Sequence, residues 1–311
     1  MTDLLPGFQL GHFTDAKALT GCTVLLCPAG TRASAEVRGS SPGSRELALL
    51  APEMSMQEIH ALLFTGGSAF GLAAADGAMR WLEVHERGYQ TPWVKVPLVP
   101  AAVIFDLSVG SKSVRPTADS GYLACDGAKD EIGELGNVGV GTGATVGKWK
   151  GMEHCMKGGF GVAAESFGPV SGFAMAVVNS VGDVVDANGA VLAGARDEHG
   201  EFFAASYPSR TLARGAAFDR ANTTLVASAF NVSLSKLELF RIAQRMHDGV
   251  ARAVIPAHTS FDGDVTFALS NGEERADFDV IAELAARLTA ESIRTAVRQA
   301  RSIPGIPGLH P

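Results

Sequence analysis

The sequence predicts an α/β protein in which stacked β-sheets are covered by helices on their outer faces. Strand-like and helix-like segments alternate along the 311 residues without a clear linker between them. The strand-like runs carry apolar residues at consecutive positions, a pattern typical of sheets that are covered on both faces. The 36 glycines fall inside apolar segments rather than in linkers, which indicates close packing of the backbone. With 46% hydrophobic residues, the chain can bury the core of one large α/β domain or of two smaller ones.

The first third of the chain is expected to contain two buried strands and one helix. Residues 22–27 (CTVLLC) and 60–64 (HALLF) are short apolar runs of the kind found in buried strands. Residues 68–86 show the spacing of small and apolar side chains expected of a helix that packs closely on a sheet. Residues 96–104 form an extended segment punctuated by proline.

The rest of the chain is expected to contain four more strands and two amphipathic helices. The strands are predicted at residues 158–165, 171–179, 225–228 and 266–270. Apolar residues repeat at helical spacing over residues 235–254, and residues 278–300 are predicted to form the final helix. The Pro-rich tail, residues 302–311, is expected to be loosely attached to the rest of the protein.

Charge and composition argue against several classes of function. The net charge of −7, without any basic cluster, argues against a nucleic-acid partner. The four cysteines form no CxxC pair and show no regular His spacing, which argues against a zinc site or a disulfide framework. The longest apolar runs contain Gly, Pro or Asp, so we expect no membrane span. Because Met1-Thr2-Asp3 does not begin a signal sequence, we expect a cytoplasmic protein, and we expect no metal or other cofactor.

The Gly-rich stretch at residues 136–148 raises the hypothesis of nucleotide binding. Residues 139–144 (GVGTGA) fit the G-x-G-x-x-A pattern of dinucleotide-binding loops. A phosphate loop ending at Lys148 would need Gly in place of Thr142 and Ser or Thr in place of Trp149. A dinucleotide fold would need an acidic residue at a strand end about 20 residues later, whereas more glycines and another lysine follow here. We therefore expect these glycines to allow close backbone approach around an active-site cleft, and nucleotide binding stays an alternative.

The tripeptide Asn222-Thr223-Thr224 is the strongest candidate for chemistry. It follows a polar segment, residues 205–221, and leads directly into the strand-like run at residues 225–227. Self-cleavage before Thr223 would expose a new N-terminus that carries a hydroxyl nucleophile beside its own amine. An α-amine titrates at about 7.7–8.0, so it can accept the hydroxyl proton near neutral pH. The alternative is an ordinary junction between a turn and a strand.

Three further sites could support such a nucleophile. Lys148 follows a run of small residues and could project from a cleft, or it could be an ordinary surface lysine. Asn179 ends a buried apolar run, where a fixed amide N–H could stabilise an oxyanion or could merely satisfy a turn. In Asp262-Gly263-Asp264 two carboxylates lie on the same side of an extended chain, and the glycine lets another backbone approach. One carboxylate could orient the nucleophile and the other could hold that arrangement, while a plain or calcium-binding turn is the alternative.

Eight short segments match, in order, the motifs of one known family. They are residues 38–46 (RGSSPGSRE), 65–72 (TGGSAFGL), 99–106 (VPAAVIFD), 136–143 (GNVGVGTG), 156–159 (MKGG), 177–179 (VVN), 222–224 (NTT) and 258–264 (HTSFDGD). Because they lie along nearly the whole chain, the sequence resembles the DmpA-type family of self-processing hydrolases, peptidase family S58. That family includes the L-aminopeptidase/D-esterases, the β-peptidyl aminopeptidases and the nylon-oligomer hydrolases.

The resemblance implies a fold and a processing step. Its members commonly form tetramers, and their fold is a four-layer αββα sandwich of the N-terminal-nucleophile hydrolase type. We therefore expect a single hydrolase domain over residues 1–311. The family precursor cuts itself before a Ser or Thr, which here would be the Asn222–Thr223 bond. The products would be a large fragment, residues 1–222, and a small fragment, residues 223–311.

The resemblance also implies a role for each candidate residue. Thr223 would be the nucleophile, Lys148 would tune and position it, and Asn179 would contribute to the oxyanion hole. Asp262 and Asp264 would form the orienting network, and together with the Asn-Thr cleavage site they are closest to the nylon-oligomer hydrolase branch.

One departure from the family concerns the substrate. Where some members place a Tyr near the nucleophile, this chain has Phe105, which cannot donate a hydrogen bond. Phe105 is therefore a candidate substrate-pocket residue whose effect on substrate class the sequence leaves open. The interpretation favoured here is an aminopeptidase for short peptides or small amides. The alternatives are an endo-acting amidase of ω-amino-acid oligomers and an unprocessed, non-catalytic binding protein.

Overall fold

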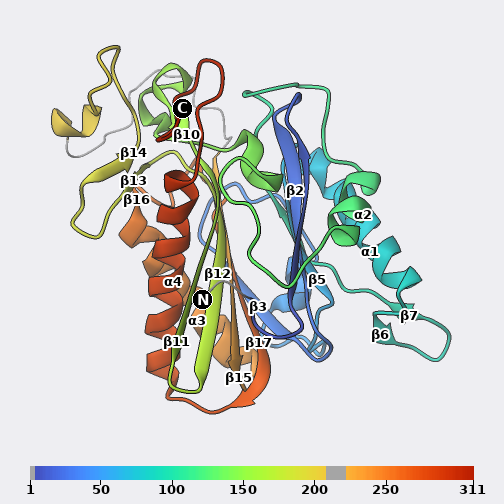
Figure 1. The fold of residues 1–311 in the computed structure, drawn as a ribbon. Coiled ribbons are helices and arrows are strands. Elements are labelled where there is room, and N and C mark those ends of the chain that lie inside the picture. Colours follow the sequence, from blue (N-terminus) through green and yellow to red (C-terminus); the bar gives the residue numbers. More distant parts are fainter. Residues whose placement is uncertain (1–3, 208–221) are drawn as a thin grey trace.

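The computed structural model contains two five-stranded β-sheets that pack face to face, with a pair of helices on the outer face of each (Figure 1). The structure describes residues 4–207 and 222–311. Most of the polar segment expected before Thr223, residues 208–221, lies outside this range. The four layers confirm the predicted αββα sandwich.

The first sheet comes from the N-terminal third of the chain. Its strands, in spatial order, are β1 (Gln9–Asp15), β2 (Thr20–Leu26), β5 (Ala61–Thr65), β8 (Ala101–Val103) and β4 (Ser44–Arg45). Helices α1 (Ala74–Val84) and α2 (Ala118–Asp126) cover its outer face. In β2, Val24 packs against these helices, whereas Leu25 lies in the core between the two sheets. The consecutive apolar residues of this strand therefore serve two different cores, as predicted.

The second sheet carries the candidate site. Its strands, in spatial order, are β11 (Gly159–Phe167), β12 (Val170–Asn179), β15 (Thr223–Val232), β17 (Val265–Glu274) and β3 (Arg32–Val37). Strands β15 and β17 run parallel because α3 (Lys236–Ala253) connects them across the outer face, where α4 (Phe278–Arg298) packs beside it. In β12, Phe173 and Met175 contribute to the core between the sheets, while Ala174 packs under the helices.

Local sequence signals explain where the two long helices begin. Ser235 caps α3, since its hydroxyl accepts from the backbone N–H of Glu238 while the Glu238 carboxylate accepts from the backbone N–H of Ser235. Asp277 caps α4 by accepting from the backbone N–H of Asp279. Both helices lie within two residues of their predicted bounds, because their apolar faces are long and strongly periodic.

Smaller elements complete the fold. They are the sheet of β14 (Val191–Ala193), β13 (Asp183–Val185) and β16 (Val254–Ile255), the pair β9 (Thr145–Val146) and β10 (Met156–Lys157), and the hairpin β6 (Tyr89–Gln90) with β7 (Lys95–Val96). The predicted helix at residues 68–86 begins as a 3₁₀ turn, η2 (Ser68–Ala73), before α1. No helix of the described residues is long and apolar enough to cross a membrane.

The C-terminal tail differs from its expectation. Rather than being loosely attached, it is held by backbone hydrogen bonds to the rest of the protein. The carbonyl of Pro307 accepts from the N–H of Lys157 at 2.8 Å, and Arg301 forms a bridge with His310 inside the tail. A Pro-rich composition lowers the propensity for regular structure but leaves carbonyl groups available as acceptors, which the sheet edge at β10 uses here.

Candidate active site at the start of strand β15

Thr223 is the first residue of β15, with β12 on one side and β17 on the other. Its register partner in the neighbouring strand β12 is Asn179, the last residue of that strand. Thr223 is only 5% exposed in the uncut chain, and its Oγ donates to the carbonyl oxygen of Asn222 at 2.5 Å. The N–H of Gly263 donates to the same oxygen at 2.8 Å. The carbonyl that precedes Thr223 is therefore polarised by two donors, one of which is the candidate nucleophile.

The loop Asp262-Gly263-Asp264 lies directly before β17 and against the start of β15. Asn222 and Asp262 form an isolated parallel bridge, which brings this loop beside the Asn222–Thr223 bond. A Cβ atom at Gly263 would lie 2.9 Å from Thr223 Oγ and 2.6 Å from the carbonyl oxygen of Ser41. Only glycine leaves room for both neighbours, so the predicted close backbone approach at this residue is confirmed.

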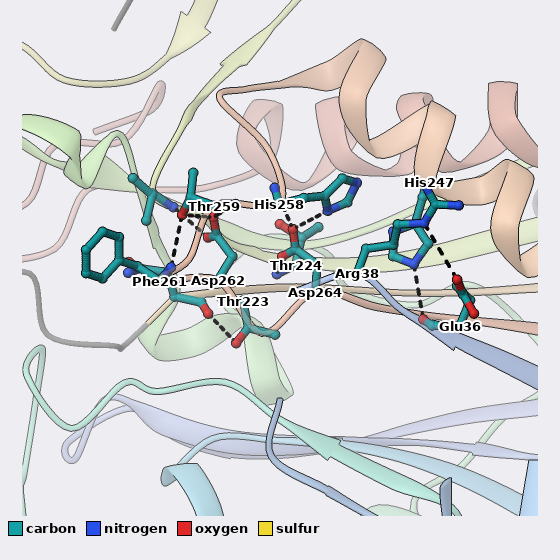
Figure 2. A network of polar contacts seen from close by, with 12 residues as sticks. Glu36, Arg38, Thr223, Thr224, His247, His258, Thr259, Phe261, Asp262 and Asp264 are labelled. Carbon is teal, nitrogen blue, oxygen red and sulfur yellow. Dashed lines mark hydrogen bonds and ion pairs between the residues drawn. The ribbon is translucent and has the colours of Figure 1, made fainter. Parts of the chain in front are cut away.

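Asp264 holds the start of β15 through the backbone (Figure 2). Its Oδ1 accepts from the N–H of Thr224 at 2.6 Å, and its Oδ2 accepts from Nδ1 of His258 at 2.8 Å. Asp264 is 2% exposed. Its carboxylate therefore fixes the peptide unit that follows Thr223.

Asp262 binds a different part of the site. Its Oδ1 accepts from the N–H of Val181 at 3.2 Å, and its Oδ2 accepts from both the N–H and the hydroxyl of Thr259. Burial, reinforced by the charge of Asp264, raises the pKa of Asp262 to about 6. This carboxylate links the loop to the segment that follows Asn179.

Lys148 is buried and lies against Asn179, so the surface-lysine alternative is wrong. Its Nζ donates to the side-chain oxygen of Asn179 at 2.8 Å and to the backbone oxygen of Asn179 at 3.0 Å. Burial lowers the pKa of Lys148 to about 7, although the charge of Asp262 opposes that shift. Gly147, with φ +73°, supplies the left-handed turn that points the chain into this position. The lowered pKa favours the neutral amine, which is the form that a proton acceptor must have.

Asn179 is completely buried at the centre of this arrangement. Besides Lys148, its side-chain oxygen accepts from the N–H of Thr145 at 3.0 Å. Its side-chain nitrogen donates to the carbonyl oxygen of Phe105 at 3.1 Å. These contacts fix the amide plane, which is what an oxyanion donor requires. Phe105 itself is half-buried, and its contact with Asn179 is made by its backbone oxygen.

Sequence reasoning missed several residues that shape the site. His258 and Thr259 lie within the matched segment at 258–264, yet only Gly263 and the two aspartates of that segment were assigned roles. Trp149 is fully buried and donates from its indole nitrogen to Asp183 at 2.8 Å, next to Lys148. No sequence pattern marks this tryptophan, because its partner lies 34 residues away.

The Gly-rich stretch has a structural role instead of the geometry of a nucleotide loop. Residues Gly139–Gly143 form a 3₁₀ turn, η3, rather than the turn between a strand and a helix that a dinucleotide loop requires. The side-chain nitrogen of Lys157 donates to the carbonyl oxygens of Gly141 and Ala144 at 2.7 and 2.9 Å. This buried lysine therefore binds two backbone carbonyl oxygens of the Gly-rich stretch.

Other features of the described residues lie apart from this site. A cavity of about 690 Å³ between α3, α4 and β13 is lined by residues such as Arg252, Glu283 and Arg294, and it does not include Thr223. Arg252 pairs with Glu283 and Arg294 pairs with Glu291, so we assign this cavity no function. The four cysteines are buried and free. No group of three or more His, Cys, Asp or Glu side chains in the described part could hold a metal ion.

Comparison with known proteins gives a consistent result. The model of "Peptidase family S58" matches residues 1–310. The chain is 44% identical to an uncharacterized aminopeptidase of Mycobacterium leprae (strain TN), with 99% of this chain and 92% of the relative covered. It is 31% identical to the 6-aminohexanoate-oligomer endohydrolase of Agromyces sp. (strain KY5R), with 86% of this chain and 74% of the relative covered.

Solved structures share the fold at lower identity. The L-aminopeptidase D-Ala-esterase/amidase from Ochrobactrum anthropi, described as a variant of the Ntn-hydrolase fold, aligns with a TM-score of 0.72 at 17% identity. That alignment covers 98% of this chain and 90% of the solved chain. A β-aminopeptidase of Burkholderia sp. aligns with a TM-score of 0.68 at 20% identity, over 98% and 89% of the two chains.

Proposed function

The chain belongs to peptidase family S58, and from this premise we propose that it cleaves its own Asn222–Thr223 bond and then hydrolyses amides with Thr223 as nucleophile. Membership of a peptidase family makes the protein a hydrolase. The self-cleavage and the identity of the nucleophile are the parts that we propose.

One observation carries the proposal. The hydroxyl of Thr223 lies 2.5 Å from the carbonyl oxygen of Asn222, and the N–H of Gly263 lies 2.8 Å from that oxygen. Attack of Oγ on the adjacent carbonyl carbon would place negative charge on an oxygen that already has a fixed donor. An ordinary turn before a strand needs neither the buried hydroxyl nor this second donor.

The cleavage chemistry follows from these positions. Thr223 Oγ adds to the carbonyl carbon of Asn222, and its proton passes to a base, for which the neutral amine of Lys148 is the candidate. The C–N bond then breaks as the nitrogen of Thr223 takes up a proton, which leaves an ester between Asn222 and the Thr223 hydroxyl. Water hydrolyses this ester, releasing the carboxylate of Asn222 and restoring the hydroxyl beside a free α-amine.

In the mature enzyme the same hydroxyl would attack the carbonyl carbon of a substrate amide. The α-amine of Thr223 would accept the hydroxyl proton and return it to the leaving amine. The Gly263 N–H and the amide of Asn179 would support the oxyanion, a contribution of about 3–4 kcal/mol per donor in comparable sites. Water would then hydrolyse the acyl-enzyme.

We propose short peptides or small amides as substrates, with release of one N-terminal residue at a time. The relative from Mycobacterium leprae, named as an aminopeptidase, covers nearly the whole chain and supports this choice. The endo-acting alternative, hydrolysis of ω-amino-acid oligomers, is supported by the 31% identity to the 6-aminohexanoate-oligomer endohydrolase. Assembly into a tetramer stays a prediction from the family resemblance.

Intact mass under denaturing conditions tests the proposal. We expect the wild-type chain to give two fragments that separate between Asn222 and Thr223, and we expect Thr223→Ala to remain whole. Thr223→Ser retains a hydroxyl and is expected to be cut, which separates loss of the nucleophile from a general disturbance of the site. A wild-type chain that stays whole after prolonged incubation would leave the unprocessed binding protein as the better interpretation.

A further inference from the structure

His258 clamps the carboxylate that holds the start of β15 (Figure 2). Its Nδ1 lies 2.8 Å from Asp264 Oδ2, and its backbone N–H donates to the same oxygen at 3.2 Å. A carboxylate oxygen can only accept, so Nδ1 of the ring carries a proton. The other oxygen of Asp264 accepts from the N–H of Thr224. Asp264 thus joins His258 directly to the residue after the candidate nucleophile.

The backbone of His258 is adapted to this contact. The residue has φ +54°, in the left-handed region that only a few per cent of residues other than glycine adopt, histidine more often than most. Such a conformation persists only where the surrounding contacts determine it. Here the two hydrogen bonds from one residue to one carboxylate oxygen hold it, so ring and backbone act together on Asp264.

The groups that face His258 come from three elements. From α3, the ring of His247 meets it edge to face with centroids 4.7 Å apart, and burial lowers the pKa of His247 to about 4, which keeps that ring neutral. From the end of β3 and the residue after it, Glu36 and Arg38 pair with each other at 3.7 Å, and the Glu36 carbonyl lies 3.1 Å from His247 Nε2. The loop itself contributes the carboxylates of Asp262 and Asp264.

These surroundings favour the charged form of His258. Burial alone would lower its pKa, but the hydrogen bond and charge of Asp264 outweigh burial, with smaller contributions from His247 and Asp262, and the pKa is raised above 6.5. Protonation of His258 would make the contact to Asp264 a charge-assisted hydrogen bond, which is stronger than one between neutral groups.

We propose that His258 is a positioning residue for Thr223, acting through Asp264 and the Thr224 amide on both self-cleavage and turnover. This inference rests on the proposed function of Thr223. In this role the imidazole ring aligns Thr223 with the Asn222 carbonyl, and the Nδ1–H group of His258 is the donor on which the alignment depends.

Two substitutions separate the donor from the backbone conformation. His258→Gly removes the ring but adopts φ +54° without strain. His258→Asn also tolerates the left-handed conformation, and its side-chain nitrogen lies where Nδ1 of histidine would be, but it cannot be protonated. His85→Asn is the control, because His85 stacks on Trp81 at the end of α1, remote from the site.

The experiment follows the appearance of the two fragments by mass after synthesis in a cell-free system, at several pH values, alongside the melting temperature of each variant. We expect His258→Gly to slow cleavage about ten- to a hundredfold, the loss expected for one charge-assisted hydrogen bond. His258→Asn should recover most of that loss, and His85→Asn should match the wild type. The ratio of the wild-type rate to the His258→Asn rate should fall as pH rises through the pKa of His258, because only the wild type has a side chain at position 258 that loses its charge.

The outcomes separate this inference from the proposed function. A wild-type chain that never cleaves contradicts the role of Thr223 itself. If the wild type cleaves and His258→Gly cleaves at the same rate with the same pH profile, the positioning role of His258 is wrong while the nucleophile stands. If His258→Asn is as slow as His258→Gly at unchanged melting temperature, the donor role is wrong.

Discussion

Replacing Lys148 by methionine is expected to stabilise the fold at neutral pH while stopping self-cleavage. Methionine keeps the length and apolar stem of lysine but removes the amine. The buried lysine destabilises the folded state, because its pKa falls from 10.5 in the unfolded chain to about 7 in the folded one. Residues that cost stability and carry a suitable pKa are expected at functional sites.

The size of the effect follows from linkage. Below the folded pKa, lysine is charged in both states and the full cost of burying the charge applies. Between pH 7 and 10.5 the unfolded chain binds more protons, so stability rises with pH. At about 1.4 kcal/mol per pKa unit, the cost is about 4 kcal/mol at pH 7 and about 1 kcal/mol at pH 9.5. The two hydrogen bonds from Lys148 to Asn179 offset roughly 2 kcal/mol of this cost.

Lys148→Met should therefore raise the free energy of unfolding by about 2 kcal/mol at pH 7 and lower it by about 1 kcal/mol at pH 9.5. The measurement is urea unfolding of Thr223→Ala with and without Lys148→Met, because both chains then stay uncut. In the Thr223 background, fragment formation should fall at least about a hundredfold, as expected for a lost general base. A stability difference that does not change between the two pH values would refute the depressed pKa, and normal cleavage would refute the role of Lys148 as base.

Two further predictions concern neighbours of Lys148 and Thr223. Gly263→Ala should slow self-cleavage about a hundredfold, because the new Cβ displaces Thr223 Oγ, and a denaturing gel measures the fragments. The control is Gly133→Ala, where a Cβ meets nothing within 4 Å, and this variant should cleave normally. Trp149→Phe in the uncut Thr223→Ala background should lower the free energy of unfolding by about 1–3 kcal/mol in urea, because the buried Asp183 loses a donor. Trp93→Phe, at an 86% exposed tryptophan, should change it by less than about 0.5 kcal/mol.

The sequence alone predicted two kinds of element: strands that are covered by apolar cores on both faces, and helices that have one long apolar face. In β12 and β2, consecutive apolar residues predict a strand that is covered on both faces. Strand β1 was missed because its residues are partly exposed and its sequence mixes Gly, His, Thr and Asp. Helix α2 was missed because Ser120, Gly121 and Cys125 on its buried side give little hydrophobic contrast.

The sequence predicted which residues form the candidate site, but it did not predict how they contact one another. Thr223, Lys148, Asn179 and the two aspartates follow from the family resemblance, and the structure brings all of them to one end of the second sheet. The resemblance did not reveal that both carboxylates accept hydrogen bonds from backbone N–H groups, those of Val181 and Thr259 for Asp262 and that of Thr224 for Asp264. That arrangement depends on single backbone angles in the loop at 258–264, such as the positive φ of His258, which no periodicity encodes.

Burial of Thr223 in the uncut chain bears on how the proposed site becomes accessible. The carbonyl of Asn222 occupies the Gly263 N–H, and Asn222 and Thr223 are each 5% exposed, so a substrate carbonyl cannot reach that donor before cleavage. Departure of the new C-terminus at Asn222 would free the Gly263 N–H in a buried setting, where an unpaired donor costs about 1–3 kcal/mol. A substrate carbonyl oxygen that replaces the Asn222 oxygen would recover this energy. Self-cleavage would therefore free the α-amine of Thr223 and the Gly263 N–H in a single step. The same N–H that binds the Asn222 carbonyl oxygen before cleavage would then bind the carbonyl oxygen of the substrate.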